Sequence, residues 1–170
     1  MDNVKNKGEL YMKTLIAYAT KHGAAEGIGK RLSEKLNSEV DLINLKEIRN
    51  IGLAEYDKVI IGSSVYMGKI RKEASRFCNE NSSKLKEKKT GIYICCMREG
   101  KEAEQELKDN FPDGLIDSAV ALSVFGGEFN FDKMNFMEKM IVKKVAGIEE
   151  TQSNISEESI DNFADLINNA

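Results

Sequence analysis

A buried strand, a glycine-bearing turn and a helix follow one another near the start of the chain. This order constrains the fold more than any other feature. Residues 13–19 form an almost uninterrupted apolar run, which is typical of a strand covered on both faces in a parallel sheet. Residues 20–25 include Gly23 and predict a turn, and apolar residues recur every three or four positions through residues 26–36, as on one face of a helix.

The turn joins the carboxyl end of a strand to the amino end of a helix. Free N–H groups and the positive end of the helix dipole meet there, so an anion, usually a phosphate, binds well at such a point. The segment lacks the complete P-loop and G-x-G-x-x-G patterns. From this segment alone, an ordinary turn without a ligand is an equally good interpretation.

Strands and helices alternate through the rest of the chain, which predicts a parallel sheet with right-handed crossovers and helices on both faces. Residues 46–56 are expected to form a short helix or an irregular crossover, and residues 112–114 a turn. In this architecture ligands bind beyond the carboxyl ends of the strands. The further strands are expected at residues 39–45, 58–62, 90–96 and 118–125, and the further helices within residues 69–85, at 101–111 and at 156–167.

Length and charge narrow the classes of protein. A chain of 170 residues fits one domain with a substantial core. Its net charge of −3 argues against general nucleic-acid binding. No apolar run is long enough to cross a bilayer, so no transmembrane segment is expected.

The polar residues 1–11 are expected to be a loose leader, and residues 12–170 to form the domain. The three cysteines, Cys78, Cys95 and Cys96, have no metal-ligand spacing and no even number for disulfides. This pattern favours reduced thiols in a cytoplasmic protein.

Three loops should meet at the binding edge of the sheet. Residues 20–25 follow the first strand, residues 63–69 follow the third, and residues 96–100 follow the fourth. The first loop suits a phosphate, the second carries the central aromatic ring of Tyr66, and the third mixes polar and apolar side chains. Together they predict a site for a flat ring with a phosphorylated tail.

The residues in these places resemble flavodoxins, in particular the flavodoxin-fold family that contains the menaquinone-dependent protoporphyrinogen oxidases. The resemblance runs from Met12 to the carboxyl terminus, and rests on the opening strand and turn, on residues 56–64, and on the segment after the fifth strand. It implies an α/β, flavodoxin-like three-layer fold with a five-stranded parallel sheet of order 2-1-3-4-5. Helices would cover both faces, a helical insert would lie after or within strand five, and FMN would bind at the switch point.

The same resemblance implies the cofactor contacts. Thr20 would offer its hydroxyl to the FMN phosphate, the next five residues would offer mainly N–H groups, and Tyr66 would stack on the flavin ring. Ala19 and Ala25 stand where such loops commonly carry hydroxyls, a departure expected to weaken binding. The full set of expected FMN contacts is Thr20, Lys21, His22, Gly23, Ala24, Ala25, Ser64, Val65, Tyr66, Met67, Gly68, Cys96, Met97 and Arg98.

Simpler interpretations stand beside several of these assignments. His22, the only histidine, is either a phosphate contact or a solvated side chain, and we expect it to be solvated. Cys95 and Cys96 are adjacent on a strand and should point to opposite faces, with no redox role. No side chain is a convincing acid or base, so neither a catalytic residue nor a metal site is expected.

Residues 129–147 are longer than this fold needs after its fifth strand. They contain three methionines and three phenylalanines, with Met134, Met137, Ile141 and Val145 at helical spacing and an excess of lysines. Such a basic amphipathic helix suits an apolar substrate, a partner protein or an anionic membrane. Alternatively, the helix folds back and buries its methionines in the core. In either case it need not touch the phosphate.

The resemblance, together with these observations, implies an FMN-binding redox protein. It would either dehydrogenate a small apolar-anionic substrate such as protoporphyrinogen or carry electrons between proteins. An interpretation from another class is a flavodoxin-like binding domain without bound flavin. The expected partners are a redox partner protein or a quinone, and no nucleic acid. The expected location is the cytoplasm, with peripheral membrane contact through residues 129–147 where the membrane is the partner.

Overall fold

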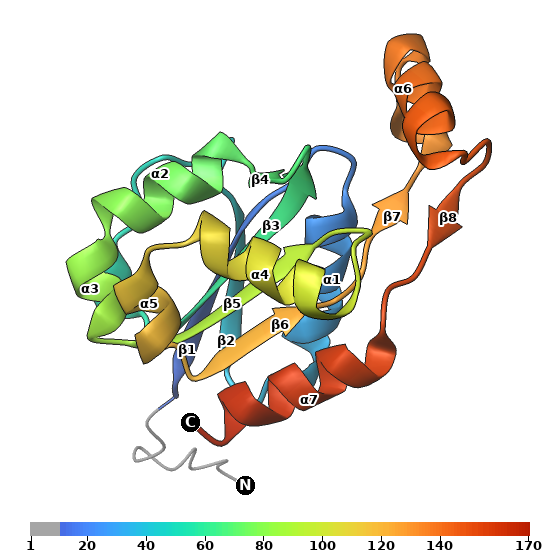
Figure 1. The fold of residues 1–170 in the computed structure, drawn as a ribbon. Helices are drawn as coiled ribbons and strands as arrows, with labels where there is room; N and C mark the ends of the chain where they lie inside the picture. The colour runs from blue at the N-terminus through green and yellow to red at the C-terminus, as the bar shows by residue number, and fades with distance from the viewer. Residues whose placement is uncertain (1–10) are drawn as a thin grey trace, which may run out of the picture.

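The computed structural model describes residues 11–170, which form a sheet between two layers of helices (Figure 1). Five parallel strands lie in the order β2-β1-β3-β5-β6, and the short β4 pairs antiparallel with β3. Counted along the chain, the parallel strands have the predicted order 2-1-3-4-5. Apart from Tyr11, the predicted leader lies outside the described residues. The strands of the sheet are β1 (Lys13–Ala19), β2 (Glu39–Asn44), β3 (Lys58–Tyr66), β4 (Lys69–Ile70), β5 (Lys89–Cys95) and β6 (Ala121–Val124).

Two helices cover one face of the sheet, and four cover the other. The first pair is α1 (Ala24–Lys35) and α7 (Glu157–Asn168). The other face carries α2 (Lys72–Glu80), α3 (Ser82–Lys86), α4 (Gly100–Asn110) and α5 (Asp113–Ser118). The predicted three-layer fold is therefore confirmed.

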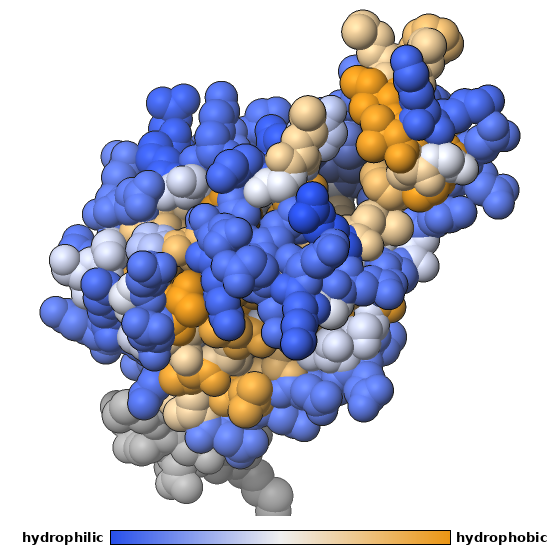
Figure 2. Space-filling model, in the orientation of Figure 1, coloured by the Kyte–Doolittle hydropathy of each residue, from blue (hydrophilic) through white to orange (hydrophobic). Residues whose placement is uncertain are grey.

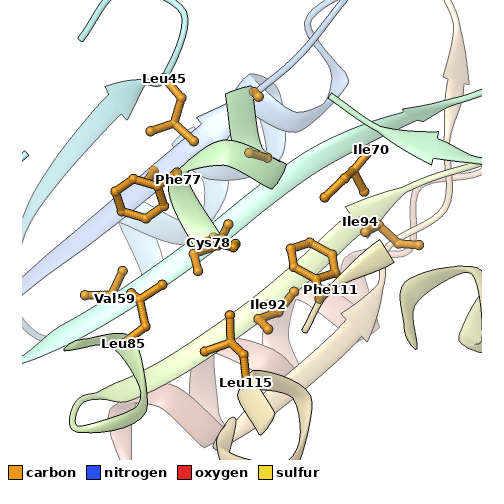
Figure 3. Close-up of a cluster of buried hydrophobic side chains, with 14 of the residues drawn as sticks. Leu45, Val59, Ile70, Phe77, Cys78, Leu85, Ile92, Ile94, Phe111 and Leu115 are labelled. Atoms are coloured by element: carbon orange, nitrogen blue, oxygen red, sulfur yellow. The ribbon is translucent and has the colours of Figure 1, made fainter. Parts of the chain in front are cut away.

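Each face of the sheet has its own apolar core, as expected for strands that are buried on both sides. Figure 3 shows the core under α2 to α5, where Phe77 and Phe111 lie over the strands. The adjacent Cys95 and Cys96 belong to opposite cores, which confirms their predicted orientations.

Tyr93 ties the sheet to the start of α1. Its hydroxyl donates a hydrogen bond of 2.7 Å to the carbonyl oxygen of Ala25. The ring crosses Gly62 so closely that a Cβ on this glycine would lie 2.0 Å from the Tyr93 Cζ atom. Because Gly62 has no side chain, the Tyr93 ring fits over it and connects β5 to the start of α1.

Two local predictions are wrong. β3 continues to Tyr66, beyond the predicted end at residue 62, because its last residues pair with β4 across a turn at Met67 and Gly68. The segment predicted as a turn at residues 112–114 instead opens α5, where the N–H of Ile116 donates to the carbonyl of Pro112. The crossover over residues 46–56 is irregular, with one 3₁₀ turn, Leu53–Glu55, and this prediction is confirmed.

The predicted insert leaves and rejoins the domain through the antiparallel pair β7 (Glu128–Phe129) and β8 (Gln152–Ser153). Between them lie a 3₁₀ turn, Phe131–Lys133, and α6 (Phe136–Ala146), which stands away from the sheet (Figure 1). No residue of α6 is buried. The interpretation that this helix buries its methionines in the core is therefore wrong for Met137 and Met140, whereas Met134, just before α6, is buried.

Candidate functional site

A cavity of about 420 Å³ lies at the carboxyl ends of β1, β3 and β5. Its walls come from the three predicted loops and from the insert. All of the predicted FMN contacts line it except Thr20, Gly23 and Ala25. Cofactor sites commonly have volumes in this range, and the position beyond the strand ends is the one expected for this sheet topology.

The loop after β1 presents backbone donors to this edge of the sheet. Gly23 precedes α1 with a φ of 95°, a conformation that glycine adopts without strain. The Gly23 N–H donates to Thr20 Oγ1 at 2.9 Å, and the Lys21 N–H donates to Ser64 Oγ at 3.2 Å. No side chain caps α1, so the N–H groups of its first turn, which have no acceptor within the helix, can bind an anion.

Ala19 and Ala25 are core residues rather than places for missing hydroxyls. Ala25 is fully buried and Ala19 is 2% exposed. Ala25 packs with the apolar residues between α1 and the sheet, so only its backbone can serve the loop. A hydroxyl at either position would therefore lie in the core and not on the surface of the loop.

Lys21 links three parts of the site. Its ammonium group pairs with the carboxylate of Glu138 on α6, and it lies 3.8 Å from the centroid of the Tyr66 ring. The pKa of Glu138 is lowered, and the hydrogen bond from Lys21 contributes most to this shift. One face of the Tyr66 ring is therefore covered by a cation.

His22 is mostly enclosed, with 17% of its side chain exposed, and its Nε2 lies 3.6 Å from Glu138 Oε2. The expectation of a solvated histidine is wrong because the insert covers it. Burial is the largest influence on its pKa and lowers it, although the Glu138 carboxylate acts in the opposite direction. Burial therefore favours the neutral form of the ring, and Lys21 is the lysine that the loop itself carries.

The insert also approaches the loop through Lys133. The Nζ atom of Lys133 lies 2.7 Å from where a Cβ on Gly23 would stand. Together with the pairing of Glu138 to Lys21, this contact brings the 3₁₀ turn and the first turn of α6 to the loop after β1. Contact between the insert and the loop after β1 was not expected from the sequence.

The turn between β3 and β4 forms the opposite side of the cavity. Met67 has a φ of 52° and is 85% exposed, and Gly68 has a φ of 75°. A non-glycine residue with positive φ is strained, and such strain is common at functional sites. Asn110 of α4 holds the turn, because its Nδ2 donates to the Gly68 carbonyl at 3.0 Å and its Oδ1 accepts from the Ile70 N–H at 3.1 Å.

The loop after β5 closes the site with Cys96, Met97 and Arg98. Burial raises the pKa of the Cys96 thiol to about 12, so it is not a nucleophile at neutral pH. Residues 11–170 contain no group of side chains suited to a metal ion.

Sequence reasoning missed the contribution of α4 and of the insert. Glu106 lies on the inner face of α4 between buried Ala103 and Leu107, and this spacing marks a carboxylate on an apolar face. Glu138 follows Asn135 by three residues, and both hydrogen bonds of a capping box are present, a pattern that can be read from sequence. The remaining unpredicted lining residues are Cys95, Gly127, Glu128, Phe129, Met134, Ile141, Val142, Val145 and Ala146.

Residues 15–156 match the flavodoxin domain family. Protoporphyrinogen IX dehydrogenase (quinone) of Escherichia coli (strain K12) is 27% identical over 85 residues, which are 48% of this chain and 47% of that protein. The chain thus spans about half the length of the curated relatives it matches.

Solved structures of flavodoxins share the fold. Two-electron reduced flavodoxin of Megasphaera elsdenii has a TM-score of 0.60 at 12% identity, over 92% of this chain and 99% of that chain. Oxidised flavodoxin 1 of Bacillus cereus has a TM-score of 0.56 at 13% identity, over 91% of this chain and 94% of that chain. Identities this low show the common fold alone.

Proposed function

Since this chain belongs to the flavodoxin domain family, we propose that it binds FMN in the cavity described above and works as a redox protein. The observation that carries the proposal is the convergence of the uncapped start of α1 and the turn at Met67 and Gly68 on this one cavity. A solved structure similar in fold, with a TM-score of 0.50 at 15% identity, is a Fusobacterium nucleatum flavodoxin variant bound to flavin mononucleotide.

The donors of the first loop fit a phosphate. In this proposal the N–H groups of His22, Ala24 and Ala25 bind the phosphate oxygens, and the Thr20 hydroxyl adds its own hydrogen, because its oxygen already accepts from Gly23. Lys21 supplies positive charge once its pairing with Glu138 is shared with the phosphate. Charge-assisted hydrogen bonds of this kind are stronger than hydrogen bonds between neutral groups.

The ring would lie between Tyr66 and the loop after β5, with the turn at Met67 and Gly68 at its edge. Lys21 covers one face of Tyr66, so the flavin would stack on the other face. The buried Met134 and the half-exposed Ile141 line the same cavity and would shield part of the ring from water. When bound, FMN accepts and releases electrons and protons, and the chain holds, orients and shields it.

We propose that the natural acceptor is a quinone and that the donor is a small apolar-anionic molecule such as protoporphyrinogen. The E. coli relative carries both names. In this chain, the apolar wall formed by Met134, Ile141 and Val145 meets the exposed cation of Arg98 at the cavity. This arrangement suits a substrate with apolar and anionic parts.

An electron carrier is the second candidate. The exposure of Met67 at the edge of the cavity favours it, because a partner protein could approach the ring there directly. Both candidates need flavin, whereas a binding domain without flavin does not.

The outer face of α6 is proposed to contact an anionic membrane surface. Phe136, Met137 and Met140 are more than half exposed, and Figure 2 shows apolar side chains gathered on the projecting helix at the upper right. Lys143 and Lys144 lie in its last turn, and such a combination of apolar and basic residues favours an interfacial position. No helix in residues 11–170 has the length and apolarity needed to cross a membrane. We propose a cytoplasmic location, since the thiols are buried and unpaired.

The absorption spectrum of the protein, purified after addition of FMN, tests flavin binding. Steady turnover of protoporphyrinogen with a quinone supports the enzyme. Reduction and reoxidation by protein partners without such turnover supports the carrier. A protein that remains colourless supports the domain without flavin.

A further inference from the structure

Glu106 is a buried carboxylate at the edge of the proposed flavin site. It is 7% exposed, whereas Glu102 and Glu104 on the same helix are exposed. Its side chain reaches under the β3–β4 turn, since Oε1 lies 3.7 Å from where a Cβ on Gly68 would stand. Glu106 also lines the cavity.

The carboxylate is only partly compensated. Arg98 Nε lies 3.6 Å from Glu106 Oε1, and the Arg98 side chain is 59% exposed. Oε2 is buried and has no hydrogen-bond partner among the described residues. A buried acceptor without a donor is destabilising, so a donor is needed to complete this position.

Neighbouring polar groups are already engaged. Asn110 Nδ2 donates to the carbonyl oxygens of Gly68 and Glu106, and Asn110 Oδ1 accepts from Ile70. Asn110 therefore holds the turn in place and does not donate to Glu106 Oε2. The neighbouring Cys96 thiol, whose pKa is raised by burial and by the Glu106 carboxylate, donates to the Arg98 carbonyl at 3.7 Å.

We propose that Glu106 is a flavin-binding residue whose Oε2 accepts a hydrogen bond from the ring N–H. The inference rests on the proposed function. The oxidised isoalloxazine ring has one N–H group, at N3, so an acceptor beside the ring selects that edge. Glu106 thereby fixes the orientation of the ring in the cavity.

The two-part test uses FMN and 3-methyl-FMN, which lacks the N3 hydrogen, with dissociation constants measured by fluorescence titration. The wild-type protein is expected to prefer FMN by at least about tenfold, as for a charge-assisted hydrogen bond. Glu106→Leu should lose this preference, and its melting temperature without flavin should rise, because a buried and only partly compensated carboxylate is replaced by an apolar side chain. Glu104→Gln, an exposed change on the same helix, should keep the wild-type preference.

Equal binding of both flavins by the wild-type protein would overturn the role of Glu106 while leaving FMN binding intact. The same holds if Glu106→Leu retains the preference for FMN. A wild-type protein that binds neither flavin would instead overturn the proposed function itself, and with it this inference. The wild-type comparison needs no variant, so it decides the question even where Glu106→Leu does not fold.

Discussion

Glu138 of α6 pairs with Lys21 of the loop after β1, so the insert is tied to the proposed phosphate site. The same carboxylate lies beside His22 and completes the capping box at the start of α6. A phosphate bound at the loop would share Lys21 with Glu138. The charge of Lys21 would therefore link cofactor binding to the position of the insert.

The pair of Glu138 and Lys21 should contribute stability that depends on pH. Because the pKa of Glu138 is lowered in the folded protein, this contribution is complete above the ordinary glutamate pKa of about 4.3 and is lost as the pH falls through the lowered folded value. Glu138→Gln keeps a capping side chain and should lower the free energy of unfolding by about 1 kcal/mol at pH 7. The difference should vanish in acid, as measured by urea denaturation.

Glu26→Gln is the matched control, because it breaks a more exposed pair with Lys30 within one helix. Its effect should be about 0.3–0.5 kcal/mol and should weaken more with added salt. A Glu138→Gln protein with wild-type stability at pH 7 would contradict the link between insert and loop.

Gly23→Ala should destabilise the protein and weaken FMN binding. The φ of 95° at this position disfavours any side chain, and the new Cβ would approach Lys133. The expected loss is about 1 kcal/mol or more. Gly27→Ala, in the interior of α1 with open space around its Cβ, should instead stabilise by about 0.5–1 kcal/mol. Thermal denaturation and FMN titration of both variants check this contrast.

Replacing residues 131–150 by a short Gly/Ser linker should leave a folded domain, since Met134 is the core residue that this change removes. Loss of the buried Met134 side chain should lower the free energy of unfolding by about 1.5–3 kcal/mol. FMN binding should persist but weaken, because α6 forms one wall of the cavity. Circular dichroism and FMN titration measure both outcomes, and a chain that no longer folds would show that the insert belongs to the core.

Charge reversal at Lys139, Lys143 and Lys144 should strongly weaken binding to anionic lipid vesicles, measured by co-sedimentation. Each lysine near such a surface contributes about 1 kcal/mol, so the affinity should fall by roughly two decades. Reversal at the exposed Lys84, Lys86 and Lys89 is the control of equal charge. If both triple variants lose binding equally, the attraction comes from overall charge and not from α6.

Much of the fold can be predicted from the sequence. β1 and β5 are largely apolar runs, and apolar residues recur every three or four positions in the helices between them. The extension of β3 to Tyr66 could not be read, since it depends on pairing with the two residues of β4. Periodicity also placed Ala25 on an apolar face, yet only the structure shows that its side chain is fully buried.

The sequence predicted the three loops that line the cavity, but not the wall that the insert forms. The loops follow from strand topology, which brings the ends of β1, β3 and β5 together. The contacts of Glu138 and Lys133 with the first loop depend on how β7 and β8 direct the insert. No local pattern in residues 129–147 encodes that direction.

The most direct test of the central claim compares FMN with riboflavin in a fluorescence titration of the wild-type protein. The N–H groups at the start of α1 and the charge of Lys21 can bind only the flavin that carries a phosphate. We therefore expect the protein to quench the fluorescence of FMN and to bind FMN at least about tenfold more tightly than riboflavin. Equal affinity for the two flavins, or no binding of either, would contradict the account.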